Sequence, residues 1–111
     1  MVRAAAIDAV ALLPGAGPIL RGGLADRNRL VRAAAVRGFR RAKVRDTWSL
    51  VKARLEDDGE WPEVASEGVR YVRALCVRDG AEALLALVHR GLKPNAWEPD
   101  VRIALEAIES L

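Results

Sequence analysis

Three large side chains, Trp48, Tyr71 and Arg41, have the residue types that most often carry the energy of protein interfaces. Tryptophan, tyrosine and arginine combine a large contact area with a polar group. These three residues therefore predict a partner-binding patch. Three neighbouring arginines would form its charged surround: Arg37, Arg40 and Arg45. The alternative is packing, in which Trp48 fills space beside Gly38 and Ala42, and Tyr71 covers the next helix with its hydroxyl in water.

Basic residues are concentrated in one part of the chain. The net charge is only +3, but residues 21–54 hold eleven Lys or Arg against Asp26 and Asp46, whereas residues 56–69 are acidic without a base. Such a stretch attracts phosphates or an acidic protein, although charged helix faces are commonly only solvated. The residues that would contact a nucleic-acid backbone are Arg29, Arg32, Arg37, Arg40, Arg41, Lys43 and Arg45. One Tyr and one Phe for base stacking, and the acidic stretch, argue against this alternative.

Catalytic and metal-binding patterns are missing from the sequence. His89 and Cys76 are the only residues of their types, so neither has a partner at metal-ligand spacing. The acids of residues 56–60 lie in an Asp-Gly turn, which favours a solvated loop over a cation site. Gly15 and Gly17 follow no strand and are not a dinucleotide-binding loop. We expect no enzyme activity, no cofactor and no metal.

A short phrase repeats along the chain and identifies the elements that must position these residues. VRAAAI begins at Val2, VRAAAV at Val31, VASEGV at Val64 and VRIALE at Val101. Successive copies start 29, 33 and 37 residues apart, a period typical of stacked helical repeats. Such an architecture provides extended surfaces for binding.

Within each repeat, apolar residues at helical spacing predict two helices joined by a turn. We expect an all-α fold, an α-solenoid of about three and a half helical hairpins with about seven helices, in one domain. The predicted repeats span residues 1–25, 26–58, 59–93 and a partial unit at 94–111. The predicted apolar stripes are Val31, Ala34, Ala35, Gly38, Phe39 and Ala42; Leu50, Val51 and Leu55; Val64, Gly68, Val69, Val72 and Leu75; Leu84, Leu87 and Val88; and Ile19, Leu20 and Leu24.

Helix starts are predicted from capping residues and prolines. Asp46 is the expected N-cap of one helix, and Pro62 fits the first turn of another, where no backbone donor is needed. Two pairs resemble capping boxes: Asp79 with Glu82, and Asn95 with Glu98.

The three candidate residues stand where the equivalent positions of other repeats are small. Trp48 aligns with Ala81 and Gly17, Tyr71 with Gly38, and Arg41 with Ala74. All three fall near helix ends that meet at the same type of turn, which predicts one shared edge of the stack. Sparse large residues along one edge are also what a designed or selected binder on a natural scaffold would carry.

The segment Asp26–Val36 resembles the HEAT-repeat signature, in which a turn with Asp is followed by Val-Arg and an Ala-rich helix. The turns at 44–46 and 77–79, both Val-Arg-Asp, resemble the short connection of that family. The likeness covers nearly the whole chain and is closest to the bacterial and archaeal HEAT-like group with phycobilisome lyase-type repeats. It implies an α-solenoid whose second helices line a concave face, usually for protein binding; some such proteins bind nucleic acid and a few act on it.

The sequence therefore favours a non-enzymatic protein-binding scaffold. Nucleic-acid binding and a purely structural solenoid fragment are the alternatives. A single cysteine and the lack of a signal peptide or long apolar run predict a cytoplasmic protein without membrane contact. Apolar residues in the first and last units, Leu12, Leu13, Ile103 and Leu105, predict either a piece of a longer protein or self-association through the terminal helices.

Overall fold

A computed structural model gives the fold and describes residues 2–44, 46–57 and 59–111. Within these residues the chain forms seven α-helices and no β-strand, which confirms the predicted all-α class. The helices are α1 (Val2–Val10), α2 (Gly17–Leu24), α3 (Arg29–Arg41), α4 (Trp48–Glu56), α5 (Pro62–Leu75), α6 (Gly80–Gly91) and α7 (Glu98–Ser110).

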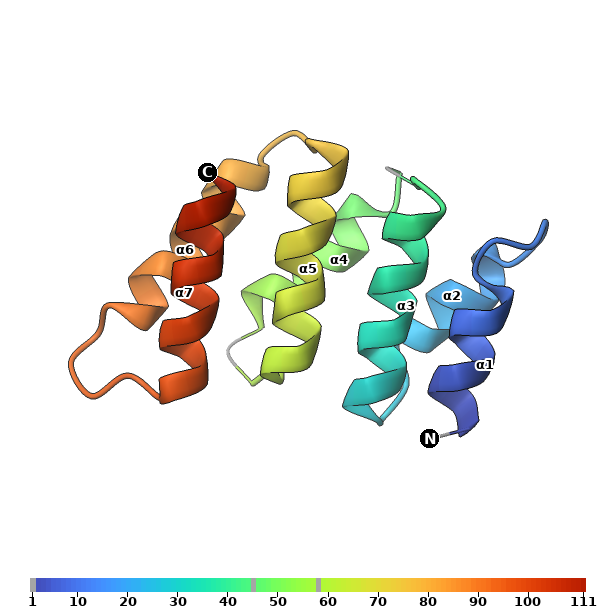
Figure 1. Cartoon of the computed structure of the whole chain (residues 1–111), viewed down its shortest axis with the longest axis horizontal. Coiled ribbons are helices and arrows are strands. Elements are labelled where there is room, and N and C mark those ends of the chain that lie inside the picture. The colour runs from blue at the N-terminus through green and yellow to red at the C-terminus, as the bar shows by residue number, and fades with distance from the viewer. Residues whose placement is uncertain (1, 45, 58) are drawn as a thin grey trace.

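The helices lie in two layers (Figure 1). α1, α3, α5 and α7 stand side by side and run in the same direction, with their N-terminal ends at the lower edge of the view; α2, α4 and α6 lie behind them. Each helix of the front layer packs on the next one in that layer, and each helix of the back layer packs on the front helix that follows it in sequence. We call the exposed surface of α1, α3, α5 and α7 the odd face.

Apolar residues at helical spacing bury one stripe of each helix, largely as the sequence predicts. The stripes of α3 and α5 are buried, except that Ala42 lies just beyond α3 and is half-buried. Leu50 is 43% exposed and Ile19 54% exposed, so their predicted places in the core were wrong. Both lie one residue before a buried neighbour, Val51 or Leu20, on short helices with room for only a narrow apolar stripe.

Two glycines let the layers approach closely. A Cβ added to Gly38 of α3 would lie 2.8 Å from a methyl group of Leu20 on α2. A Cβ added to Gly68 of α5 would lie 2.6 Å from a methyl group of Leu55 on α4. In both cases a glycine of the front layer lies against a leucine of the preceding back helix.

The helix ends differ from several of the capping predictions. Asn28 caps α3, because its side chain accepts a hydrogen bond from the Leu30 amide at 2.8 Å. Pro62 occupies the first turn of α5, as predicted. Three other capping predictions were wrong. α4 and α7 start later than expected, so that Thr47 takes the N-cap position predicted for Asp46 and Trp97 the one predicted for Asn95. Asp79 is the N-cap residue of α6, but at φ 64° its side chain makes no capping hydrogen bond.

Candidate functional site

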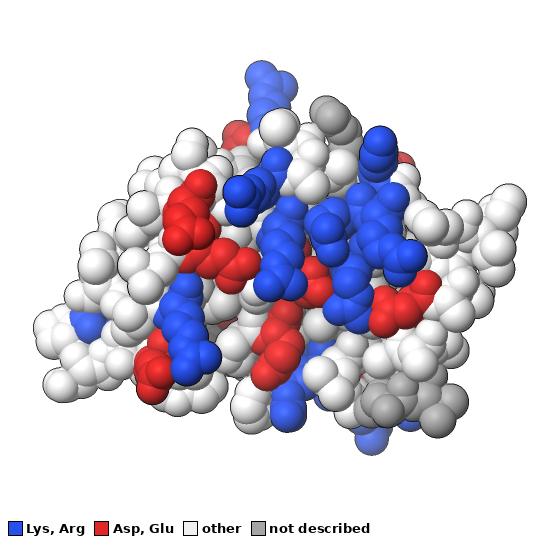
Figure 2. Space-filling view, viewed as in Figure 1, with Lys and Arg blue, Asp and Glu red and all other residues white. Residues whose placement is uncertain are grey.

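Acidic and basic side chains alternate across the odd face (Figure 2). Five of them form a connected series that we call the charge ladder: Asp8 on α1, Arg37 on α3, Glu67 and Arg70 on α5, and Glu106 on α7. Three of its four links join neighbouring helices of the front layer, and the fourth, between Glu67 and Arg70, lies within α5. The ladder therefore ties the front-layer helices to one another. It also makes the middle of the odd face polar.

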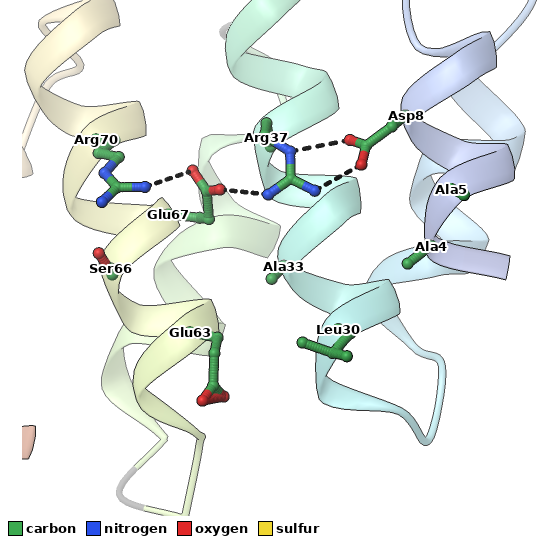
Figure 3. A pocket seen from close by; sticks show the side chains of 10 residues that line it. All are labelled: Ala4, Ala5, Asp8, Leu30, Ala33, Arg37, Glu63, Ser66, Glu67 and Arg70. Atoms are coloured by element: carbon green, nitrogen blue, oxygen red, sulfur yellow. Dashed lines mark hydrogen bonds and ion pairs between the residues drawn. The ribbon is translucent and has the colours of Figure 1, made fainter. Parts of the chain in front are cut away.

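Arg37 is the centre of the charge ladder (Figure 3). Its Nε and one terminal nitrogen donate to the two carboxylate oxygens of Asp8 at 2.9 and 2.7 Å, and its other terminal nitrogen donates to Glu67 at 2.7 Å. The hydrogen bond to Asp8 raises the pKa of Arg37 above its ordinary value; partial burial opposes this rise, and the bond to Glu67 adds to it. Arg37 is therefore a cation held by two carboxylates of the same molecule, and three of its five N–H donors are used in these bonds.

Glu67 is a buried acid, only 4% exposed. Its Oε2 accepts the hydrogen bond from Arg37, while its Oε1 lies 3.7 Å from a terminal nitrogen of Arg40 and 3.7 Å from one of Arg70. Three guanidinium groups thus surround one carboxylate. Removing one partner of such a buried ion pair is destabilising, because the charge that remains is left without compensation.

Tyr71 is fully buried, which contradicts its predicted place in a surface patch. Its hydroxyl donates to the Val44 carbonyl oxygen at 2.6 Å and lies 3.3 Å from the Thr47 hydroxyl. Trp48 stacks on Tyr71 with 6.0 Å between ring centroids and an interplanar angle of 11°. Trp48 is itself only partly exposed and contacts both groups of core residues. This aromatic pair joins the two halves of the core.

The predicted arginines divide between internal and exposed roles. Arg41 is exposed, and its guanidinium donates to the backbone oxygen of Asp8 at 3.4 Å. Arg40 is 29% exposed beside Glu67. Arg45 lies outside the described residues. Of the edge predicted from Trp48, Tyr71 and Arg41, the Tyr71 ring is therefore buried, Trp48 is partly exposed and Arg41 is exposed.

Several residues predicted to contact nucleic acid are paired with carboxylates. Arg32 donates to both oxygens of Glu60, with a shortest distance of 2.7 Å, and its side chain is only 13% exposed. Arg29 pairs with Glu63 at 3.1 Å. Together with Arg37, these pairs neutralise much of the basic stretch from within the fold.

The exposed tryptophans are Trp61 (45% exposed) and Trp97 (54% exposed). They line a pocket of about 410 Å³ between the N-terminal parts of α5 and α7, which we call the tryptophan pocket. Its lining is Trp61, Pro62, Glu63, Ser66, Trp97, Pro99, Arg102, Ile103 and Glu106. The Arg29 guanidinium lies 4.4 Å from the centre of the Trp61 ring, a cation–π contact that holds this indole in place.

A second pocket of about 560 Å³ adjoins it on the odd face (Figure 3). It lies between α1, α3 and α5, and it shares Glu63 and Ser66 with the tryptophan pocket. Alanines 4, 5 and 33 line it beside the charge ladder. We call the two adjoining pockets together the groove of the odd face. The groove is lined by α1, α3, α5 and α7, whereas the family resemblance implied a binding face on the second helix of each predicted pair.

One sequence signal could have identified the exposed tryptophans. Trp61 and Trp97 each occupy the N-cap position of a helix, where Ser, Thr, Asp or Asn is favoured. Neither makes a side-chain capping bond. A large apolar residue that replaces a stabilising cap at two equivalent places indicates a role other than local helix stability.

No metal cluster or membrane span is found in the part of the chain that the structure describes. No three His, Cys, Asp or Glu side chains there come together in a way that could hold a metal ion. None of the described helices is long and apolar enough to cross a bilayer. Comparisons of the chain with protein-family models, curated proteins and solved structures found no match.

Proposed function

We propose that this chain is a non-enzymatic protein-binding scaffold, a HEAT-like α-solenoid that binds its partner in the groove of the odd face. The observation that carries the proposal is the pair of exposed tryptophans in one pocket of that groove. Exposed aromatic residues in a concave site are the usual energetic centres of protein interfaces. The site is thus moved from the edge around Trp48 to the groove.

The solenoid assignment has two supports. The repeated phrase begins on or within α1, α3, α5 and α7, all of which lie in one layer. Each helix of the back layer also packs on the front helix that follows it in sequence, α2 on α3, α4 on α5 and α6 on α7. Both are expected if helix pairs stack one on the next in the same way.

Rigid presentation is the proposed mechanism. Arg29 holds the Trp61 ring, and the ladder centred on Arg37 ties the front-layer helices to one another. Groups that are ordered before contact lose little conformational entropy on association, which leaves more of the contact energy for affinity. Nucleic-acid binding has weaker support, because Arg29, Arg32 and Arg37 are already paired with carboxylates.

A three-bait affinity capture tests the proposal. The baits are the unaltered chain, a double variant Trp61→Asn with Trp97→Asn, and the control Leu92→Asn, which alters an apolar residue that is 70% exposed and outside the groove. We expect a protein that is retained by the unaltered chain and the control but lost from the double variant. Identical retention by all three baits, or retention of no protein, would contradict the proposal.

A further inference from the structure

The tryptophan pocket presents the same residue type at the same position of two neighbouring helices. Trp61 is the N-cap residue of α5, and Trp97 is the N-cap residue of α7. Both have extended backbone angles, φ −78° and ψ 150° for Trp61 and φ −63° and ψ 135° for Trp97. α5 and α7 pack side by side and run in the same direction (Figure 1), so their N-terminal ends lie at the same edge of the layer, and both tryptophans line one pocket there.

This arrangement sets the repeat that a ligand must match. Packed helices have axes about 8–10 Å apart, so equivalent residues on α5 and α7 are separated by about that distance. An extended polyproline II segment rises about 3.1 Å per residue and repeats every three residues, which gives about 9.3 Å per turn. Residues three apart on such a segment therefore meet both tryptophans without bending the chain.

The pocket's own chemistry suits a prolyl side chain. Apolar and aromatic groups dominate its lining, which includes Pro62, Pro99 and Ile103 in addition to the two tryptophans. Its charged members already have partners: Glu63 pairs with Arg29 at 3.1 Å, Glu106 with Arg70 at 3.3 Å, and Arg102 with Glu98 at 2.8 Å. The aromatic surface is therefore the part of the pocket that a ligand can contact. Proline-rich segments bind aromatic grooves of this kind with little loss of conformational entropy.

Charge gives the ligand a direction across the groove. α7 holds four acidic side chains and one arginine, whereas α3 holds five arginines and no acid. Two of the α7 acids are already neutralised, because Glu98 pairs with Arg102 and Glu106 with Arg70. Asp100 and Glu109 are the α7 acids left for a ligand, so a basic residue is favoured where the ligand crosses α7. Such complementarity also orients the partner during its approach.

We propose that the tryptophan pocket binds an extended, proline-containing segment of a partner protein, with prolines three residues apart on Trp61 and Trp97 and a basic residue over α7. This proposal rests on the proposed protein-binding function and names the chemistry of the partner. Each tryptophan also carries an indole N–H donor, and the backbone carbonyls of an extended segment are available as acceptors because the segment has no internal hydrogen bonds.

Fluorescence anisotropy with labelled synthetic peptides tests it. The probes are alanine-based peptides with two prolines three residues apart and two arginines at either the amino or the carboxyl end. Controls have the prolines replaced by alanine, or the arginines replaced by glutamates. We expect binding of one proline–arginine peptide, and at least about tenfold weaker binding of both controls.

Asparagine variants separate lost binding from lost folding. Asparagine is a favoured N-cap residue, so Trp61→Asn and Trp97→Asn should melt at the same temperature as the unaltered chain or higher. Each should nevertheless bind the peptide at least about tenfold more weakly, while Leu92→Asn binds normally. Equal binding of the alanine control peptide, or unchanged binding by both variants, would overturn the proline assignment. If no peptide binds but protein capture still requires the tryptophans, only the ligand chemistry is wrong; if capture is also independent of them, the proposed function fails as well.

Discussion

Replacing Tyr71 by phenylalanine removes one hydroxyl from the core and leaves the ring in place. The lost hydrogen bond to the Val44 carbonyl is short, at 2.6 Å, and the ring is fully buried. A net hydrogen bond contributes about 1 kcal/mol, and a buried partner left without one raises the cost toward about 3 kcal/mol. Val44 keeps the bond from the Thr47 hydroxyl at 3.2 Å, so its oxygen is not left unpaired. We therefore expect a loss of about 1–2 kcal/mol in the free energy of unfolding.

Urea unfolding followed by far-UV circular dichroism measures this loss. The midpoint should fall while the dependence on urea is unchanged, because the surface exposed on unfolding is the same. Ser49→Ala is the matched control: it deletes an exposed hydroxyl of α4 and should change stability by less than about 0.5 kcal/mol. A Tyr71→Phe variant as stable as the unaltered chain but weaker in partner binding would refute the assignment of Tyr71 to the core.

The charge ladder and the helix packing give two further predictions. Glu67→Gln should lower the free energy of unfolding by about 1–2 kcal/mol. This loss is smaller than the about 3–5 kcal/mol expected for a fully buried ion pair, because Arg37 is 32% exposed and keeps its bond to Asp8. Urea unfolding measures the change, and a value under about 0.5 kcal/mol would show that the ladder is not stabilising. Gly91→Ala should destabilise the fold by about 1–3 kcal/mol, because the added Cβ would lie 2.4 Å from a side-chain atom of α7. Gly22→Ala is the control: its Cβ would have no neighbouring atom within 4 Å, so it should stabilise the fold by about 0.5–1 kcal/mol. Equal shifts of the two melting temperatures would contradict the packing of α6 on α7.

The periodicity of the sequence predicted the helices but did not identify every core residue. Val31, Phe39 and Val69 recur at helical spacing, and each is buried. Leu50 follows the same pattern and is exposed, because the pattern does not say how wide a stripe the neighbouring helices cover. Ile103, which the sequence suggested for an exposed terminal surface, is 7% exposed and packs in the core.

The site depended on contacts that single-chain patterns do not contain. Arg37 lies 29 residues from Asp8 and 30 from Glu67, so its pairing became visible only when three helices were placed side by side. The size of Tyr71 marked it as unusual among the repeats, but size alone does not distinguish a buried ring from an exposed one. Trp61 and Trp97 lie at the starts of α5 and α7, and their exposure depends on helix packing that the residue type alone does not reveal.

Exposed apolar residues outside the groove bear on the predicted self-association through the terminal helices. Leu12 and Leu13 are 61% and 59% exposed after α1, and Leu105 and Ile108 are 57% and 48% exposed on α7. The exposure of Leu12, Leu13 and Leu105 agrees with the prediction of apolar surface residues in the terminal units, whereas Ile103, predicted with them, is buried. Self-association through them stays a prediction, and it does not involve the tryptophan pocket, since none of the four lines it.

The most direct test compares the chain's three tryptophans in one binding experiment. Their indole N–H groups give separate signals in a two-dimensional ¹⁵N–¹H NMR spectrum, which is recorded during titration with the proline–arginine peptide. The account predicts that the signals of Trp61 and Trp97 move together with one dissociation constant, while that of Trp48, packed against the core, stays in place. Movement of the Trp48 signal alone, or of none of the three, would contradict it.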